Sequence, residues 1–160
     1  MKKIAIIGML LLILISCGGS KNIQSSIQED DKQIPKNFGR EDVVILAVKA
    51  GNFLTKIYEK RFPENYFGKY VLIEKDELKS AKYSDVSKYR YLLVFNSRLD
   101  KSNPNSGAMT GAGVDVSASA GLMDRATQRV YQTKLFPVGI SNLLKDYLVV
   151  LEQVRRKNSN

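Results

Sequence analysis

Paired carboxylates are the acid–base arrangement that remains to be considered for catalysis in this chain. It contains no histidine and a single cysteine, Cys17, so Ser-His-Asp and Cys-His arrangements and histidine-containing zinc sites are excluded. Paired carboxylates could still support a small hydrolase or transferase. The candidates lie at the ends of predicted strands and in turns: Asp76, Glu77, Asp100, Asp115 and Asp124. Acids at such positions equally suit solubility and turn hydrogen bonds, and we expect no catalytic, metal or cofactor site.

Two glycine-containing stretches lack the residues that known phosphate-binding and nucleophile motifs require. The polar stretch 100–113 contains Gly107, Gly111 and Gly113, but no Lys-Ser/Thr pair follows and Val116 stands where a dinucleotide fingerprint needs glycine. A mobile hairpin loop is therefore expected there. Gly139-Ile140-Ser141 is not a nucleophile elbow, because Leu143 replaces the second glycine.

The first 16 residues have the organisation of a secretory signal. Lys2 and Lys3 form a positive start, residues 4–15 are apolar, and small residues follow from Ser16. A membrane-spanning helix needs about 20 apolar residues, so this run is too short to span a bilayer. Cleavage before Cys17 is predicted.

The sequence Leu14-Ile15-Ser16-Cys17 resembles the lipobox of bacterial lipoproteins. That resemblance implies that Cys17 carries a diacylglycerol and, in many bacteria, a further acyl chain such as palmitate. Two or three acyl chains hold a protein firmly at a membrane. Gly18 in place of Asp implies the outer membrane, facing the periplasm, if the organism has two membranes. A lipid on Cys17 also removes the one thiol that could form wrong disulfides.

The charge of the chain suggests what it could contact. The net charge is +9, and removing Lys2 and Lys3 leaves 23 basic against 16 acidic side chains, about +7. Such a protein is attracted to anionic surfaces, which in the cell envelope are lipids and polymers. The expected partners are the membrane, through Cys17, and an envelope protein or anionic polymer, with no nucleic acid.

Residues 17–40 are predicted to be a flexible tether. They are rich in Gly, Ser, Asn, Gln and charge, with isolated Ile23, Ile27 and Ile34 and no sustained period. A single α/β domain is expected over residues 41–157.

The pattern of that domain predicts a mixed sheet of about five strands with two main helices, in the order β-α-β-(α)-β-β-β-α. Asn52 and Ser141 are the expected helix caps, and Pro63 is expected to end or kink the first helix. A helical crossover implies that the first two strands are parallel. The expected strands are 43–48, 70–73, 90–99, 114–122 and 129–136, and the helices begin at 52 and 141.

The turn after the fourth strand has the pattern Asp-x-x-Thr, in Asp124 and Thr127, followed by Gln128. This stretch resembles bacterial envelope domains: the curli-assembly lipoprotein, the lipoprotein activators of penicillin-binding proteins, and the N-terminal domain of the Tol periplasmic protein. Those domains usually have glycine at the place of Gln128. The resemblance implies an α/β binding or assembly module without enzymatic activity.

Overall fold

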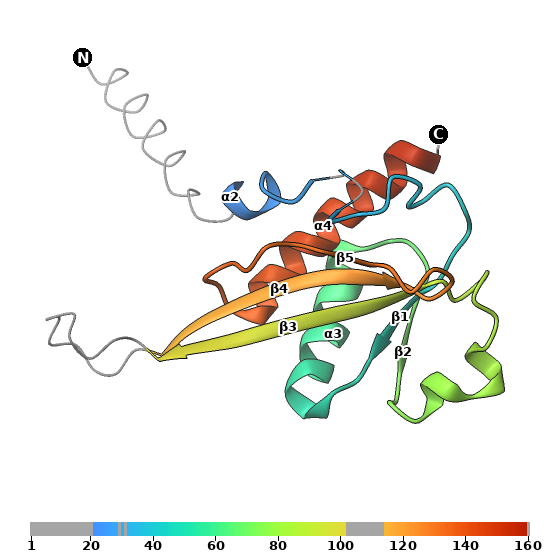
Figure 1. Ribbon diagram of the computed structural model, residues 1–160, viewed down its shortest axis with the longest axis horizontal. Helices are drawn as coiled ribbons and strands as arrows, with labels where there is room; N and C mark the ends of the chain where they lie inside the picture. The colour runs from blue at the N-terminus through green and yellow to red at the C-terminus, as the bar shows by residue number, and fades with distance from the viewer. Residues whose placement is uncertain (1–20, 29, 31, 102–113, 160) are drawn as a thin grey trace, which may run out of the picture.

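The computed structural model describes residues 21–28, 30, 32–101 and 114–159. Cys17, the signal sequence and the glycines at 107, 111 and 113 lie outside the described residues. The fold is a five-stranded mixed sheet in the order β2-β1-β3-β4-β5, with two main helices. The predicted α/β class and element order are confirmed (Figure 1).

The parallel half of the sheet is built around β1 (Ile45–Val48). This strand pairs in parallel with β2 (Tyr70–Ile73) on one side and with β3 (Tyr91–Lys101) on the other. Alternate residues of β1 point to opposite faces, and Ile45, Leu46 and Ala47 are all fully buried. β1 is therefore an inner strand that is covered on both faces.

The antiparallel half of the sheet continues from β3. β4 (Val114–Asp124) pairs with β3 along its whole length, and β5 (Val130–Gln132) pairs with the end of β4. A single bridge between Ala118 and Phe136 extends this contact. The predicted hairpin is therefore present, with a shorter last strand than the sequence suggested.

Both main helices cover one face of the sheet. α3 (Gly51–Asn65) connects β1 to β2, and α4 (Ile140–Ser159) follows β5. α4 packs against the sheet through an apolar face whose buried side chains include Leu143, Leu144, Tyr147, Leu148, Leu151 and Val154. The opposite face of the parallel half is covered by the segment with the short helices η2 (Glu77–Lys79) and η3 (Ala81–Tyr83), through Leu78 and Tyr83.

The predicted helix ends were wrong in their details. α3 begins at Gly51, so Asn52 lies inside its first turn, and Ala50 at the cap has no side-chain acceptor. Pro63 lies inside the helix, which continues to Asn65, and the main-chain N–H of Tyr66 donates to the carbonyl of Phe62 to close the last turn. Phe53, expected on the buried face, is 68% exposed.

Ser141 does not cap α4 either. The helix begins one residue earlier, at Ile140. The Ser141 hydroxyl instead accepts a hydrogen bond of 3.1 Å from Arg61 Nε on α3. Ser141 therefore connects the two helices. At the start of α4, the carbonyl of Gly139 accepts hydrogen bonds from the N–H groups of Asn142 and Leu143.

The predicted tether over residues 17–40 is wrong for its described part. Ile23 and Ile27, in and after the short helix α2 (Lys21–Gln24), are buried in the core, and so are Ile34 and Phe38. We call residues 21–40 the N-terminal arm. The single domain therefore begins before Glu41, because four large apolar side chains of the arm complete its core.

Hydrogen bonds fasten the N-terminal arm along its length. Gln24 Nε2 donates to Asp146 Oδ1 at 2.8 Å, and the Tyr147 hydroxyl donates to the carbonyl of Gln33 at 3.2 Å. Near the end of α4, the Asn158 amide donates to the carbonyl of Phe38 at 2.9 Å. Such bonds to main-chain groups hold a segment without regular structure in one place.

Candidate binding site

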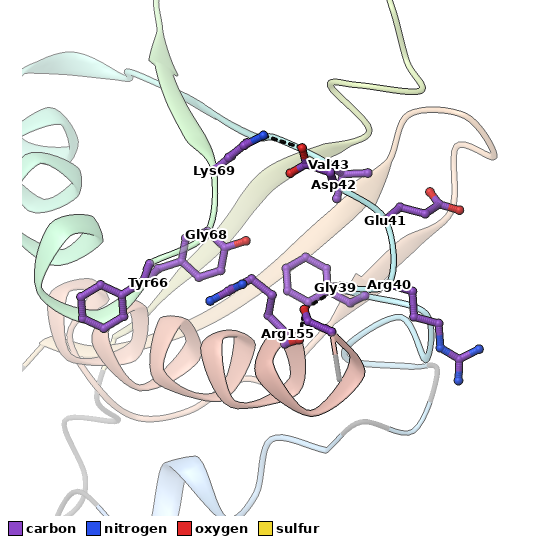
Figure 2. Close-up of a pocket in the computed structure, with 12 residues that line it drawn as sticks. Gly39, Arg40, Glu41, Asp42, Val43, Tyr66, Gly68, Lys69 and Arg155 are labelled. Atoms are coloured by element: carbon purple, nitrogen blue, oxygen red, sulfur yellow. Dashed lines mark hydrogen bonds and ion pairs between the residues drawn. The ribbon is translucent and has the colours of Figure 1, made fainter.

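The candidate site is a cavity of about 370 Å³ at the start of β2. Three segments that are far apart in the sequence surround it: the end of the N-terminal arm, the loop between α3 and β2, and the C-terminal turn of α4. Figure 2 shows Arg155 reaching from α4 toward Tyr66, while Arg40 points away from the cavity. The lining residues are Phe38, Gly39, Arg40, Glu41, Asp42, Val43, Tyr66, Phe67, Gly68, Lys69, Arg155 and Ser159.

Aromatic rings form the base of this cavity. Phe38 lies with its ring centre 5.5 Å from that of Tyr91 and 6.4 Å from that of Tyr66. Phe38 and Tyr66 are almost fully buried, and burial raises the pKa of the Tyr66 hydroxyl above its ordinary value. Phe67 is different, since it is 65% exposed at the rim. An apolar base with one exposed ring is typical of a site that accepts an apolar side chain.

The close contact between the arm and α4 depends on Gly39. Its φ of +91° lies in the left-handed region, and a Cβ atom at this position would come within 2.6 Å of Arg155 Cα. Both the backbone angle and the space therefore require glycine. This glycine lets the arm reach α4 and form one wall of the cavity.

Glu152 fixes the wall that α4 provides. Its carboxylate accepts hydrogen bonds from Arg155 at 2.8 and 2.9 Å, from Arg156 at 2.6 Å, and from the main-chain N–H of Phe67 at 3.1 Å. Burial alone would raise the pKa of Glu152, but these donors outweigh it and lower the pKa to about 2. Glu152 therefore remains ionised and ties the α3–β2 loop to the end of α4.

The acids at the cavity mouth also have cationic partners. Lys69 pairs with Asp42, and Arg90 pairs with Glu41 at 2.7 Å. Pairs of this kind at the surface position side chains more than they stabilise the fold. The cavity thus combines an apolar base with acids that are paired with cations, and both features suit a binding surface.

In the part of the chain that the structure describes, the five acids named from the sequence do not form one cluster but lie at three separate places. Asp76 and Glu77 lie at η2, beyond the end of β2, and only Asp76 lines the open depression of about 640 Å³ there, with Lys49, Glu74, Lys75 and Lys79. Asp100 and Asp115 are register partners on β3 and β4, at the end of the hairpin farthest from Asp124.

Asp124, at the other end of β4, is a buried acid that holds a turn in place. It is 2% exposed, and its carboxylate accepts hydrogen bonds from Arg90 at 3.1 and 3.2 Å and from the N–H of Ala126 at 3.0 Å. Burial alone would raise its pKa, but these bonds lower it below the ordinary value. The Asp-x-x-Thr turn continues through Gln128, which has a φ of 59°. Asp124 therefore closes this turn onto the start of β3.

Sequence reasoning missed the cavity because it assigned Phe38 and Gly39 to a tether. Ile23 and Ile27, like Ile34 and Phe38, are four residues apart, a spacing that places side chains on the same side of a helical turn. That repeated spacing was the available signal. Arg155, Tyr66 and Lys69 had no motif, since they meet only through the fold.

In comparisons with known proteins, no protein-family model, no curated protein and no solved structure matches the chain. Among the residues that the structure describes, none of the helices is long and apolar enough to cross a membrane. In the same residues, no cluster of three or more acidic or cysteine side chains could hold a metal ion.

Proposed function

We propose that this protein is a lipid-anchored lipoprotein of the bacterial envelope. Its domain binds an extended segment of another envelope protein at the free edge of β2, without enzymatic activity. The observation that carries the proposal is the position of β2, which ends the sheet with the cavity at its start. An exposed strand edge is a ready template for pairing with another chain.

The main-chain bonds of β2 identify the groups that would pair. The carbonyl of Lys69 accepts from the N–H of Ile45 at 3.0 Å, and that of Ile73 accepts from Lys49 at 2.8 Å. Since successive residues of a strand direct these groups to opposite sides, the N–H and C=O groups of Tyr70 and Leu72 face away from β1. They would pair with the added segment.

The opposite edge of the sheet is partly covered by the chain itself. The N–H of Gln132 on β5 donates to the carbonyl of Lys32, in the N-terminal arm, at 3.0 Å. Proteins commonly cover edges that are not used for pairing. This asymmetry favours β2 as the binding edge, with the apolar base of the cavity receiving a side chain of the partner.

The lipobox at Cys17 supports the anchor. The five acids lie at three separate places, and none of them lines the cavity, which favours binding over carboxylate chemistry at this site. We propose a protein as the partner, because the main-chain donors and acceptors at a strand edge recognise another polypeptide. An anionic polymer would offer no matching row of groups.

Photo-crosslinking in the native envelope tests this proposal. Phe67, at the rim, is replaced by benzoylphenylalanine, and Phe53 is the matched control because it is 68% exposed on α3, against 65% for Phe67. After irradiation we expect a discrete protein adduct at position 67 and none at position 53. Equal adducts at both positions would overturn the proposal.

A pair of substitutions at Leu72 tests strand pairing itself. Leu72→Pro and Leu72→Ala both shorten the side chain, but only proline removes the outward N–H. We expect the adduct at position 67 to survive Leu72→Ala and to fall about tenfold with Leu72→Pro, as the loss of one well-formed hydrogen bond predicts. The same yield with both variants, at matched melting temperatures, would show that β2 does not pair.

A further inference from the structure

The N-terminal arm determines how far the domain can move from its anchor. α2 begins at Lys21, four residues after Cys17. An extended chain spans at most about 3.6 Å per residue, so four residues reach about 14 Å. This inference rests on the lipid anchor of the proposed function.

The arm cannot act as an additional spacer while it remains docked. Ile27 and Ile34 are 5% and 0% exposed, and the Gln24 amide donates to the buried carboxylate of Asp146. Releasing the arm would bring these side chains into water and leave Asp146 without that donor, which is unfavourable. The docked arm therefore belongs to the folded domain.

We infer that the bilayer surface is the partner of the arm side of the domain, the side formed by α2 and the exposed residues Gln28, Lys32 and Lys36. This side would rest on the lipid headgroups. Figure 1 shows α2 and β2 on opposite sides of the molecule. The four strand spacings from β5 to β2 amount to about 19 Å, so the binding edge points away from the membrane toward a partner.

Chain length, and not charge, holds the domain in this orientation. The arm carries Lys21, Lys32, Lys36 and Arg40 against Glu29, Asp30 and Asp31. With charges of both signs, its attraction to anionic lipid is weak. The charge of the arm is therefore not what selects this side, and we expect the orientation on neutral vesicles as well as on anionic ones.

Fluorescence quenching on the lipidated full-length protein tests the inference. A cysteine is introduced by Gln28→Cys or Lys75→Cys and labelled with a thiol-reactive fluorophore. Because lipid occupies Cys17, the introduced cysteine carries the only label on each variant. The vesicles are phosphatidylcholine, with or without phosphatidylglycerol, and contain a headgroup spin label. We expect the Gln28 label to be quenched at least about threefold more than the Lys75 label, which lies beyond β2.

A spacer variant provides the control. Ten Gly/Ser residues inserted after Gly19 add a flexible spacer with a root-mean-square length of about 16–19 Å, from about 5–6 Å × √n, and should remove the difference between the labels. Equal quenching of both labels without the spacer, or an unchanged difference with it, would overturn the inference while leaving the anchor intact. If the protein fails to sediment with vesicles, the anchor and the orientation are both wrong.

Discussion

At the scale of single residues, Glu152 is the acid whose charge contributes most clearly to the fold. Its pKa is about 2 in the folded protein, against an ordinary value of 4.5. A carboxyl group with a lowered pKa stabilises the folded state fully above its ordinary pKa, and this contribution is lost as the pH falls through the folded value. The stabilisation should therefore disappear between about pH 4.5 and pH 2.

Glu152→Gln tests this linkage. We expect the variant to lose about 1–3 kcal/mol of unfolding free energy at neutral pH, because Arg155 and Arg156 lose their ionised partner. The difference from the wild type should shrink as the pH approaches 2. Urea unfolding measured at several pH values would show this, and a difference that does not depend on pH would contradict the ionised state of Glu152.

Gln128 occupies a left-handed backbone conformation, with a φ of 59°, at the place where the resembling envelope domains usually have glycine. Glycine adopts this conformation without steric cost. Gln128→Gly should therefore stabilise the domain by up to about 1 kcal/mol, less any loss of the bond from its side chain to the carbonyl of Arg125. Thermal unfolding that shows a clear loss of stability would mean that this bond matters more than the backbone strain.

At the scale of elements, α4 is the main cover of the sheet. Leu148 is fully buried on it, whereas Gln153 is exposed. We expect Leu148→Ala to cost about 2–5 kcal/mol, as is usual for a large-to-small change in a core, and Gln153→Ala to cost less than about 0.5 kcal/mol. Chemical denaturation of the soluble domain measures both. Similar small effects would mean that α4 is a surface element.

The N-terminal arm should contribute strongly to stability. A soluble fragment that starts at Glu41 lacks Ile34 and Phe38, and we expect it to unfold at a much lower temperature than one that starts at Gly18, or not to fold. Gly39→Ala should destabilise the longer fragment by about 1–3 kcal/mol, whereas Gly139→Ala, with nothing within 4 Å of a new Cβ, should not. Coincident melting curves for the two fragments would show that the arm adds no stability and behaves as a flexible tether.

The element order could be predicted from the sequence because periodicity reports which side of an element is covered. The apolar stripe of α4 is an example, since its large side chains are buried; the alternating sequence of β4 predicted a strand correctly, but both its apolar and its polar residues over 118–122 are buried. The arm was not predicted, since its apolar side chains become buried only against α4 and the sheet, and the four-residue spacing of two pairs was the one local sign of it. The cavity could not be predicted either, because Phe38, Tyr66 and Arg155 come from distant segments and no local pattern joins them.

At the scale of the whole molecule, the account has three parts: an anchor, an arm that keeps the domain near it, and a strand edge on the far side. In the proposed arrangement, the docked arm would limit the distance from the bilayer, and the edge of β2 would offer main-chain groups to a partner. The partner and the orientation both depend on the lipid at Cys17.

Labelling with radioactive palmitate, comparing the wild type with Cys17→Ser, is therefore the most direct test. We predict that the wild-type protein incorporates the label and fractionates with the outer membrane, as Gly18 implies for an organism with two membranes. The Cys17→Ser variant should incorporate none and accumulate as an unprocessed precursor or away from the membrane. Label in the variant, or no label in the wild type, would contradict the account.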